Sequence, residues 1–109
     1  MDNNNTLPYN RIGQEEAKQM MDEHPDYIIL DVRTPQEFNL GHIENAINLP
    51  NEEIGYEPPE ELPDINKPLL VYCRSGHRSL HAALKLHFLG YQNIYEFGGI
   101  NTWPYKIVK

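Results

Sequence analysis

The sequence predicts an α/β domain whose parallel sheet is covered by helices on both faces. Short runs of apolar residues, many of them β-branched or aromatic, have the length and composition of strands that are buried on both sides. Segments with helical spacing separate these runs, and strands that alternate with helices form parallel sheets. The strands are expected at residues 27–32, 46–49, 69–72 and 93–97.

Length and composition fit one small domain. The chain has 109 residues, of which 39% are hydrophobic, enough for a single core. Residues 1–10 are polar and show no periodicity, so we expect an N-terminal arm there and the domain at 11–109. The polar N-terminus does not resemble a secretory signal, no apolar run reaches membrane-spanning length, and a single cysteine excludes an intramolecular disulfide. These observations predict a cytoplasmic domain.

Each expected helix has its own start and stop signals. Two acids and a one-sided apolar pattern favour a helix from 13 to 21, which residues 24–26 should end. Thr34 and Glu37 form a capping-box pattern before a short helix that ends near Gly41. A third helix is expected at 78–89. The proline-rich segment 51–68 is predicted to be a connector with one helical turn near its start.

Charge divides the chain into two parts. Residues 1–66 contain 15 acids and three bases, whereas residues 67–109 contain six bases and a single acid, Glu96. The net charge of -7 argues against general nucleic-acid binding, which needs many basic contacts to phosphates. The cysteine lies in the basic part, and a small cluster of cations suits a small anion.

The residues that are best suited to chemistry follow directly after the expected strand 69–72. A cysteine at the end of a buried strand is followed by a short polar loop and then by a helix, which is where open α/β sheets bind ligands. The loop and the helix N-terminus direct backbone N–H groups and positive potential at the thiol, and cysteines in such places have pKa values of about 3.5–7.5. The candidate site residues are Cys73, Arg74, Ser75, Gly76, His77 and Arg78.

Two other interpretations of Cys73 are open at this point. A lone cysteine at a strand end can simply be a small buried apolar residue. Cys73, His77 and His81 are also spaced by four residues, which would suit a metal site if the three side chains converged. Convergence is not expected, because His81 should lie one turn into the helix while Cys73 lies in a curled loop. Two arginines and a glycine beside the thiol favour a reactive cysteine.

Four segments of the chain resemble the motifs of rhodanese-like domains. Residues 73–79, Cys-Arg-Ser-Gly-His-Arg-Ser, and the following helix are similar to the family's active-site loop and helix. Residues 31–38 are similar to its D-V-R-x-x-x-E-[FY] stretch, and residues 41–50 to G-H-I-x-G-A-x-N-[IL]-P. Residues 98–103 are similar to G-G-[IVMF]-x-x-W. Two departures are Asn45, where the family has glycine, and Pro104, which should end the terminal helix early.

The resemblance implies a three-layer α/β/α domain with a central, mainly parallel sheet of about five strands. It also implies sulfurtransferase activity, in which Cys73 takes sulfane sulfur from a donor such as thiosulfate, becomes a persulfide and passes the sulfur on. The amides of residues 74–78 would stabilise the persulfide, and Arg74 and Arg78 would bind the anionic donor. The implied acceptor is cyanide, glutathione or a thioredoxin-like protein. No metal, organic cofactor, nucleic acid or membrane is implied.

Loop length separates sulfur transfer from related chemistry on the same fold. Phosphatases and arsenate reductases that resemble this family have five residues between cysteine and arginine, whereas four separate Cys73 from Arg78. A persulfide carrier that rarely turns over alone is the second hypothesis, and a phosphatase or arsenate reductase is the third. Outside the loop, we expect Asp31 to pair with Arg33, with contact to the pocket wall as the alternative role. We expect His42 to fix a turn, and Trp103 to pack in the core or in the pocket wall.

Overall fold

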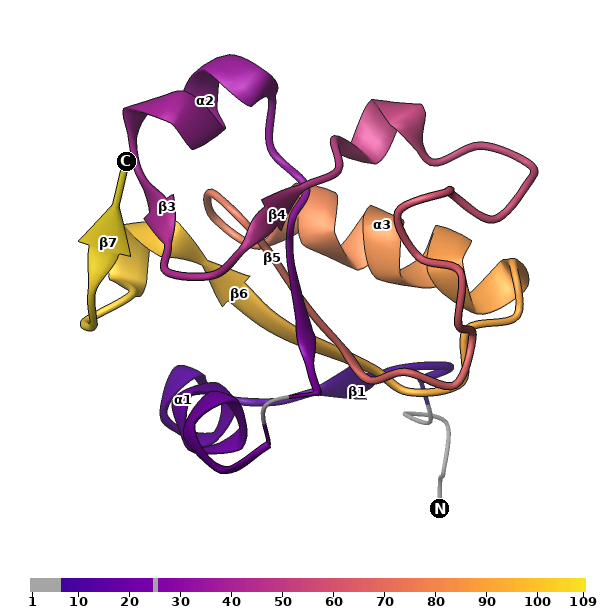
Figure 1. The fold of residues 1–109 in the computed structure, drawn as a ribbon, viewed down its shortest axis with the longest axis horizontal. Coiled ribbons are helices and arrows are strands. Elements are labelled where there is room, and N and C mark those ends of the chain that lie inside the picture. Colours follow the sequence, from indigo (N-terminus) through magenta and orange to yellow (C-terminus); the bar gives the residue numbers. More distant parts are fainter. Residues whose placement is uncertain (1–6, 25) are drawn as a thin grey trace.

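Five parallel strands form the central sheet of the protein (Figure 1). The computed structural model describes residues 7–24 and 26–109. The strands lie in the order β1-β6-β5-β2-β4, and each neighbouring pair is parallel, which confirms the predicted fold class. Their bounds are β1 Asn10–Arg11, β2 Ile28–Asp31, β4 Ile47–Asn48, β5 Leu69–Cys73 and β6 Ile94–Gly99.

The central strand β5 is buried on both faces, as its continuous apolar run predicts. Leu69, Val71 and Cys73 pack in one core cluster, with the inner side of helix α3 (His77–Phe88). Leu70 and Tyr72 point to the opposite face and belong to a second cluster with helix α1 (Gln14–Glu23). Figure 1 shows α1 and α3 on opposite sides of the strands. The alternation of side chains along one strand therefore creates the three layers.

The helices begin and end close to their sequence signals. Helix α2 (Pro35–Leu40) begins with the predicted capping box, in which the Glu37 N–H donates to Thr34 Oγ1. Helix α3 begins at His77, one residue earlier than predicted, because Gly76 adopts a left-handed conformation with φ 105° and acts as its N-cap. The predicted helical turn of the connector is the 3₁₀ helix η2 (Asn51–Glu53). Pro25, within the predicted stop of the first helix, lies outside the described residues.

Three short strands were not predicted from the sequence. Strand β1 pairs with β6, so the predicted boundary after residue 10 falls inside it, and residues 1–6 of the expected arm lie outside the described residues. Strands β3 (His42–Ile43) and β7 (Ile107–Val108) form a second, antiparallel sheet. Pro104 follows the short 3₁₀ helix η3 (Ile100–Thr102), and the chain then turns back to form β7. The residues after Pro104 therefore pair with β3.

Within the described residues, none of the helices combines the length and apolar character that a bilayer crossing requires.

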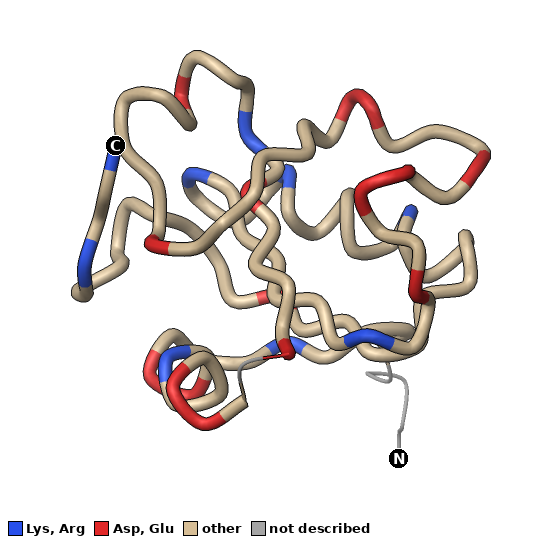
Figure 2. The backbone as a smooth tube through the Cα atoms, in the orientation of Figure 1, with Lys and Arg blue, Asp and Glu red and all other residues tan. Residues whose placement is uncertain are grey.

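Most acids of the first part of the sequence are exposed on the outside of the fold. Figure 2 shows red segments along α1 and along the connector that follows η2, whereas blue segments mark the loop after β5 and the start of α3. Glu37 is an exception, since this acid pairs with Arg78 at the start of α3.

Candidate active site

Residues 73–78, which comprise the end of β5, the loop after it and the first residues of α3, are held against the end of β6 by a close backbone approach. A Cβ atom on Gly99 would collide with the Arg74 carbonyl, so this position requires glycine. The Asn101 N–H donates to the same carbonyl at 3.1 Å. Gly99 therefore fixes the position of the Cys73 loop (residues 73–78) against the end of β6.

The Cys73 thiol lies at the centre of this loop and is only 1% exposed. The Gly76 N–H donates to Sγ at 3.0 Å, and it can do so because Gly76 has a positive φ that most residues avoid. Helix α3 begins directly after Gly76, so its N-terminal partial charge faces the sulfur. Of the predicted backbone donors, Gly76 is the one whose N–H the structure places on sulfur.

The two arginines of the loop lie in different surroundings. Arg78 donates to both carboxylate oxygens of Glu37, at 2.7 and 2.9 Å, which joins α3 to the first turn of α2. This hydrogen bond from Arg78 lowers the pKa of Glu37 to about 2 and raises the pKa of Arg78. Arg78, which we expected to bind the anionic donor, is therefore already paired with Glu37 within the protein. Arg74 is exposed and pairs with no carboxylate of the described residues.

A cleft of about 470 Å³ opens beside the loop. Arg74 lines it on the loop side, Glu37 and Leu40 line it on the α2 side, and Ile107 of β7 closes one edge. Leu40 is 78% exposed and Ile107 is 42% exposed, so the rim combines cationic and apolar character. A second cavity, of about 320 Å³, lies beside α1 and Trp103 and contains no residue of the Cys73 loop.

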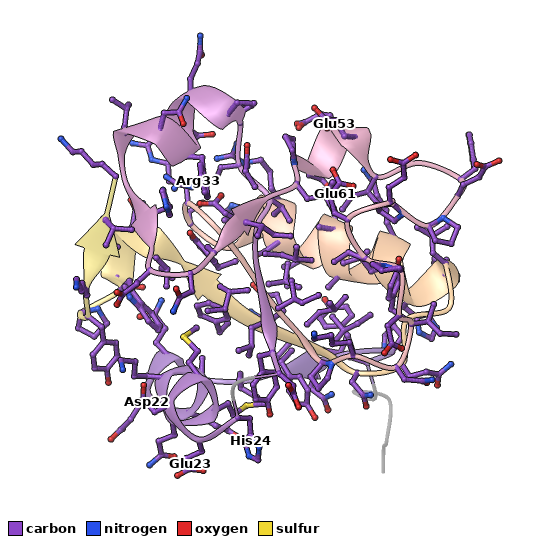
Figure 3. The ribbon with its side chains drawn as sticks, viewed as in Figure 1. Asp22, Glu23, His24, Arg33, Glu53 and Glu61 are labelled. Carbon is purple, nitrogen blue, oxygen red and sulfur yellow. The ribbon has the colours of Figure 1, made fainter. Side chains whose placement is uncertain are left out.

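A buried polar network lies beside the cleft, and its Arg33 also lines the cleft. Arg33 donates to both oxygens of Asp31, with the shortest distance 2.6 Å, and to the Gly41 carbonyl at 2.7 Å. The Tyr72 hydroxyl donates to Asp31 at 2.6 Å, and burial raises the pKa of Tyr72. Figure 3 shows Arg33 between α2 and the carboxyl ends of the central strands. The predicted pairing of Asp31 with Arg33 is confirmed.

Several of the other predicted side-chain roles are also confirmed. His42 Nδ1 donates to the Phe38 carbonyl at 2.9 Å, and the two rings stack, so His42 fixes the turn after α2. Asn45 has φ 73°, the left-handed geometry expected where the family has glycine. Trp103 is buried against Phe97.

His77 is exposed at the start of α3, and its Nδ1 is 3.4 Å from Ser75 Oγ. Among described residues, no three metal-ligating side chains gather at one point.

Two buried groups behind the thiol were not predicted from the sequence. Ser79 Oγ lies 3.4 Å from Cys73 Sγ and 2.5 Å from Glu96 Oε2. Ser79 is fully buried and Glu96 is 1% exposed. A signal was present: Glu96 is the only acid after residue 66, and it interrupts an apolar strand two residues after Ile94, on the same face. A charged side chain in the middle of such a strand indicates a specific partner.

Comparisons with known proteins agree with this geometry. The family model for the rhodanese-like domain matches residues 13–105. Thiosulfate sulfurtransferase GlpE of Pseudomonas syringae pv. syringae is 33% identical over 96 residues, 87% of this chain and 87% of that protein. Thiosulfate sulfurtransferase PspE of Escherichia coli is 34% identical over 80 residues, 73% of this chain and 77% of that protein.

A solved structure of a rhodanese-related protein has a similar fold. The crystal structure of a rhodanese-related protein from Thermoplasma volcanium superposes with a TM-score of 0.77 at 31% identity, covering 92% of this chain and 98% of that one. The five-stranded parallel sheet flanked by helices agrees with this structural match. The chain therefore belongs to the family of rhodanese-like domains.

Proposed function

We propose that the protein is a sulfurtransferase that moves sulfane sulfur from an anionic donor to a thiophilic acceptor through a persulfide on Cys73. The observation that supports this most is the placement of Cys73 Sγ, which receives the Gly76 N–H at the N-terminus of α3. An amide donor and a helix N-terminus stabilise negative charge on sulfur. The names of the relatives PspE and GlpE support thiosulfate as one donor.

The reaction is two displacements at sulfur. Sγ attacks the sulfane sulfur of thiosulfate, a sulfur–sulfur bond forms, and the bond to the sulfonate group breaks with its electron pair leaving as sulfite. An acceptor such as cyanide or a thiol then attacks the outer sulfur, and the electron pair of the Cys73 S–S bond returns to Sγ. Covalent catalysis of this kind divides one transfer into two easier steps. The acceptors that we propose, glutathione or a thioredoxin-like protein, fit a cytoplasmic role.

Arg74 is the cation that we assign to the donor. Its guanidinium lines the cleft beside the loop, and no carboxylate of the described residues neutralises it. Arg78 is engaged with Glu37, and we propose that it contributes positive potential near Cys73 while Glu37 holds it in place. A guanidinium can bind two oxygens of a sulfonate at once, which orients the sulfane sulfur toward the thiol.

A persulfide carrier supplied by a protein donor is the second candidate. The exposed apolar side chains of Leu40 and Ile107 at the cleft rim favour it, because a small anion makes no use of them. A phosphatase or arsenate reductase is less well supported, since the four-residue spacing between Cys73 and Arg78 makes a smaller loop. Transfer from a persulfide-bearing protein with negligible thiosulfate turnover would identify the carrier.

Intact-protein mass spectrometry tests the main proposal. Incubation with thiosulfate should add one sulfur atom to the wild-type chain, and cyanide should remove it with the formation of thiocyanate. Cys73→Ser should abolish the adduct, since it replaces the sole cysteine. A wild-type chain that gains no cyanide-sensitive sulfur from thiosulfate or from a persulfide donor, or that hydrolyses an aryl phosphate in a Cys73-dependent reaction, would contradict sulfur transfer.

A further inference from the structure

A chain of buried contacts runs from the Cys73 thiol into the protein. Ser79 Oγ is 3.4 Å from Cys73 Sγ and 2.5 Å from Glu96 Oε2. The Gly98 N–H donates to the same carboxylate oxygen at 2.9 Å. Ser79 comes from α3, Glu96 from β6 and Cys73 from β5, so three elements meet at this point. None of the three side chains is more than 1% exposed.

The chemistry of Ser79 decides the direction of these hydrogen bonds. A hydroxyl has one hydrogen, and an ionised carboxylate can only accept. The Ser79 hydrogen is therefore directed to Glu96, which leaves an oxygen lone pair for Cys73, and the Cys73 thiol donates to that oxygen. Ser79 therefore offers Sγ a hydrogen-bond acceptor, whereas the Gly76 N–H offers it a donor.

A negative charge on the cysteine changes the balance. A thiolate or a persulfide anion would then lie one serine away from a buried carboxylate, and like charges in a buried site favour protonation of one of them. The charged groups that face the pair are Arg11 from β1, whose Nε is 3.4 Å from Glu96 Oε1, and Arg78 from α3, whose pKa Cys73 helps to raise. His77 is the other titratable residue in the first turn of α3. Arg11 is more than half exposed, so it neutralises Glu96 only weakly.

We propose that Glu96, acting through Ser79, holds the proton of Cys73 while the cysteine carries sulfur. This inference rests on the proposed function. As Sγ attacks the sulfane sulfur and sulfite leaves with its electron pair, the thiol proton moves to Ser79 Oγ and the Ser79 proton moves to Glu96. The total charge is unchanged, because one persulfide anion replaces one carboxylate anion. Ser79, which touches Sγ, is a catalytic residue, and Glu96 is a positioning residue.

The second half of the cycle reverses the proton movement. When the acceptor takes the outer sulfur, the electron pair of the S–S bond returns to Sγ, which becomes basic. Ser79 gives its proton to Sγ and regains one from Glu96, so the resting network forms again. The buried anion therefore alternates between Glu96 and the persulfide, and the loop is not required to stabilise two anions at once.

Difference infrared spectroscopy tests where the proton is. Loading the wild-type protein with thiosulfate should produce the C=O stretch of a protonated, buried carboxylic acid, and cyanide should remove it. In Glu96→Gln, the fraction of protein that carries sulfur by mass should lack this band. Glu44→Gln is the matched control, since Glu44 is a surface carboxylate that does not line the cleft beside Cys73, and its sulfur adduct should keep the band. A wild-type protein that gains sulfur by mass without this band would overturn the inference but not the proposed function.

Alkylation of the resting protein tests the coupling without any sulfur donor. Glu96→Gln removes the neighbouring anion, so the iodoacetamide rate profile should shift to lower pH, with the rate near neutrality rising on the order of tenfold. Glu44→Gln, a surface change far from Cys73, should leave the profile in place. An unchanged profile in Glu96→Gln would overturn the inference. Because no donor is used, this result stays interpretable even if thiosulfate proves not to be a substrate.

Discussion

Two buried carboxylates, Asp31 on β2 and Glu96 on β6, lie on the two strands that flank β5 and have opposite kinds of partners. Asp31 accepts from the Arg33 guanidinium and from the Tyr72 hydroxyl, and Arg33 itself is only 5% exposed. Glu96 accepts from a serine hydroxyl and an amide, and the cation that pairs with it among the described residues is Arg11, whose side chain is more than half exposed. Asp31 is neutralised inside the protein, whereas Glu96 is hydrogen-bonded but poorly neutralised.

The difference separates a structural acid from one suited to chemistry. A buried carboxylate with a bidentate arginine keeps its charge and fixes geometry. A buried carboxylate without such a partner can gain a proton when another anion forms nearby. Asp31 joins β2, β5 and the turn after α2, while Glu96 lies behind the reactive thiol. Variants at these two acids and at their partners can break or sharpen this contrast.

The largest effect is expected from Arg33→Ala. It leaves Asp31 buried without its cation, and breaking a buried pair in this way lowers the free energy of unfolding by about 3–5 kcal/mol. Urea denaturation monitored by Trp103 fluorescence measures it. Glu96→Gln is the matched variant, because the amide keeps a hydrogen bond to Ser79, and it should cost less than about 1.5 kcal/mol. Equal losses in the two variants would show that both acids are structural.

An intermediate effect is expected at Glu37, a partly exposed acid with a bidentate arginine. Its pKa in the folded protein is about 2, below its usual value of 4.5, so it binds fewer protons folded than unfolded. The stability it contributes is present above about pH 4.5 and is lost as the pH falls toward 2. Between those limits, wild-type stability should fall more steeply than that of Glu37→Gln, by on the order of 1–3 kcal/mol. Parallel urea titrations at each pH would reveal the difference, and superimposable slopes would contradict it.

The smallest effect on stability is expected at Arg74, where a substitution should change substrate binding instead. Unlike Arg33 it is exposed and has no carboxylate partner among the described residues, so it is available to an anion. Arg74→Gln should raise the KM for thiosulfate roughly tenfold, the equivalent of about 1.4 kcal/mol, with little change in kcat or stability. Steady-state kinetics with cyanide as acceptor measures it. A KM that stays at the wild-type value would assign donor binding to another group.

Local signals predicted the elements that position the site. The apolar run before Cys73, the capping box at Thr34 and the glycine of the loop each act over a few residues, and each was found where expected. The short strands β1, β3 and β7 have two residues each and no periodicity of their own. They exist because a neighbouring strand offers free backbone groups, which no local pattern encodes.

The sequence by itself determined which residue is the candidate nucleophile and which segment surrounds it, because a strand, a loop and a helix N-terminus follow one another without interruption from residue 69 to 79. It also determined that positive charge surrounds the thiol. Only the tertiary structure decided how that charge is used. Glu37 and Arg78 are 41 residues apart, and Glu96 reaches Ser79 across 17. Such pairs depend on how the layers pack, so folding assigns Arg78 to Glu37, leaves Arg74 exposed, and places the single acid of the basic region behind the sulfur.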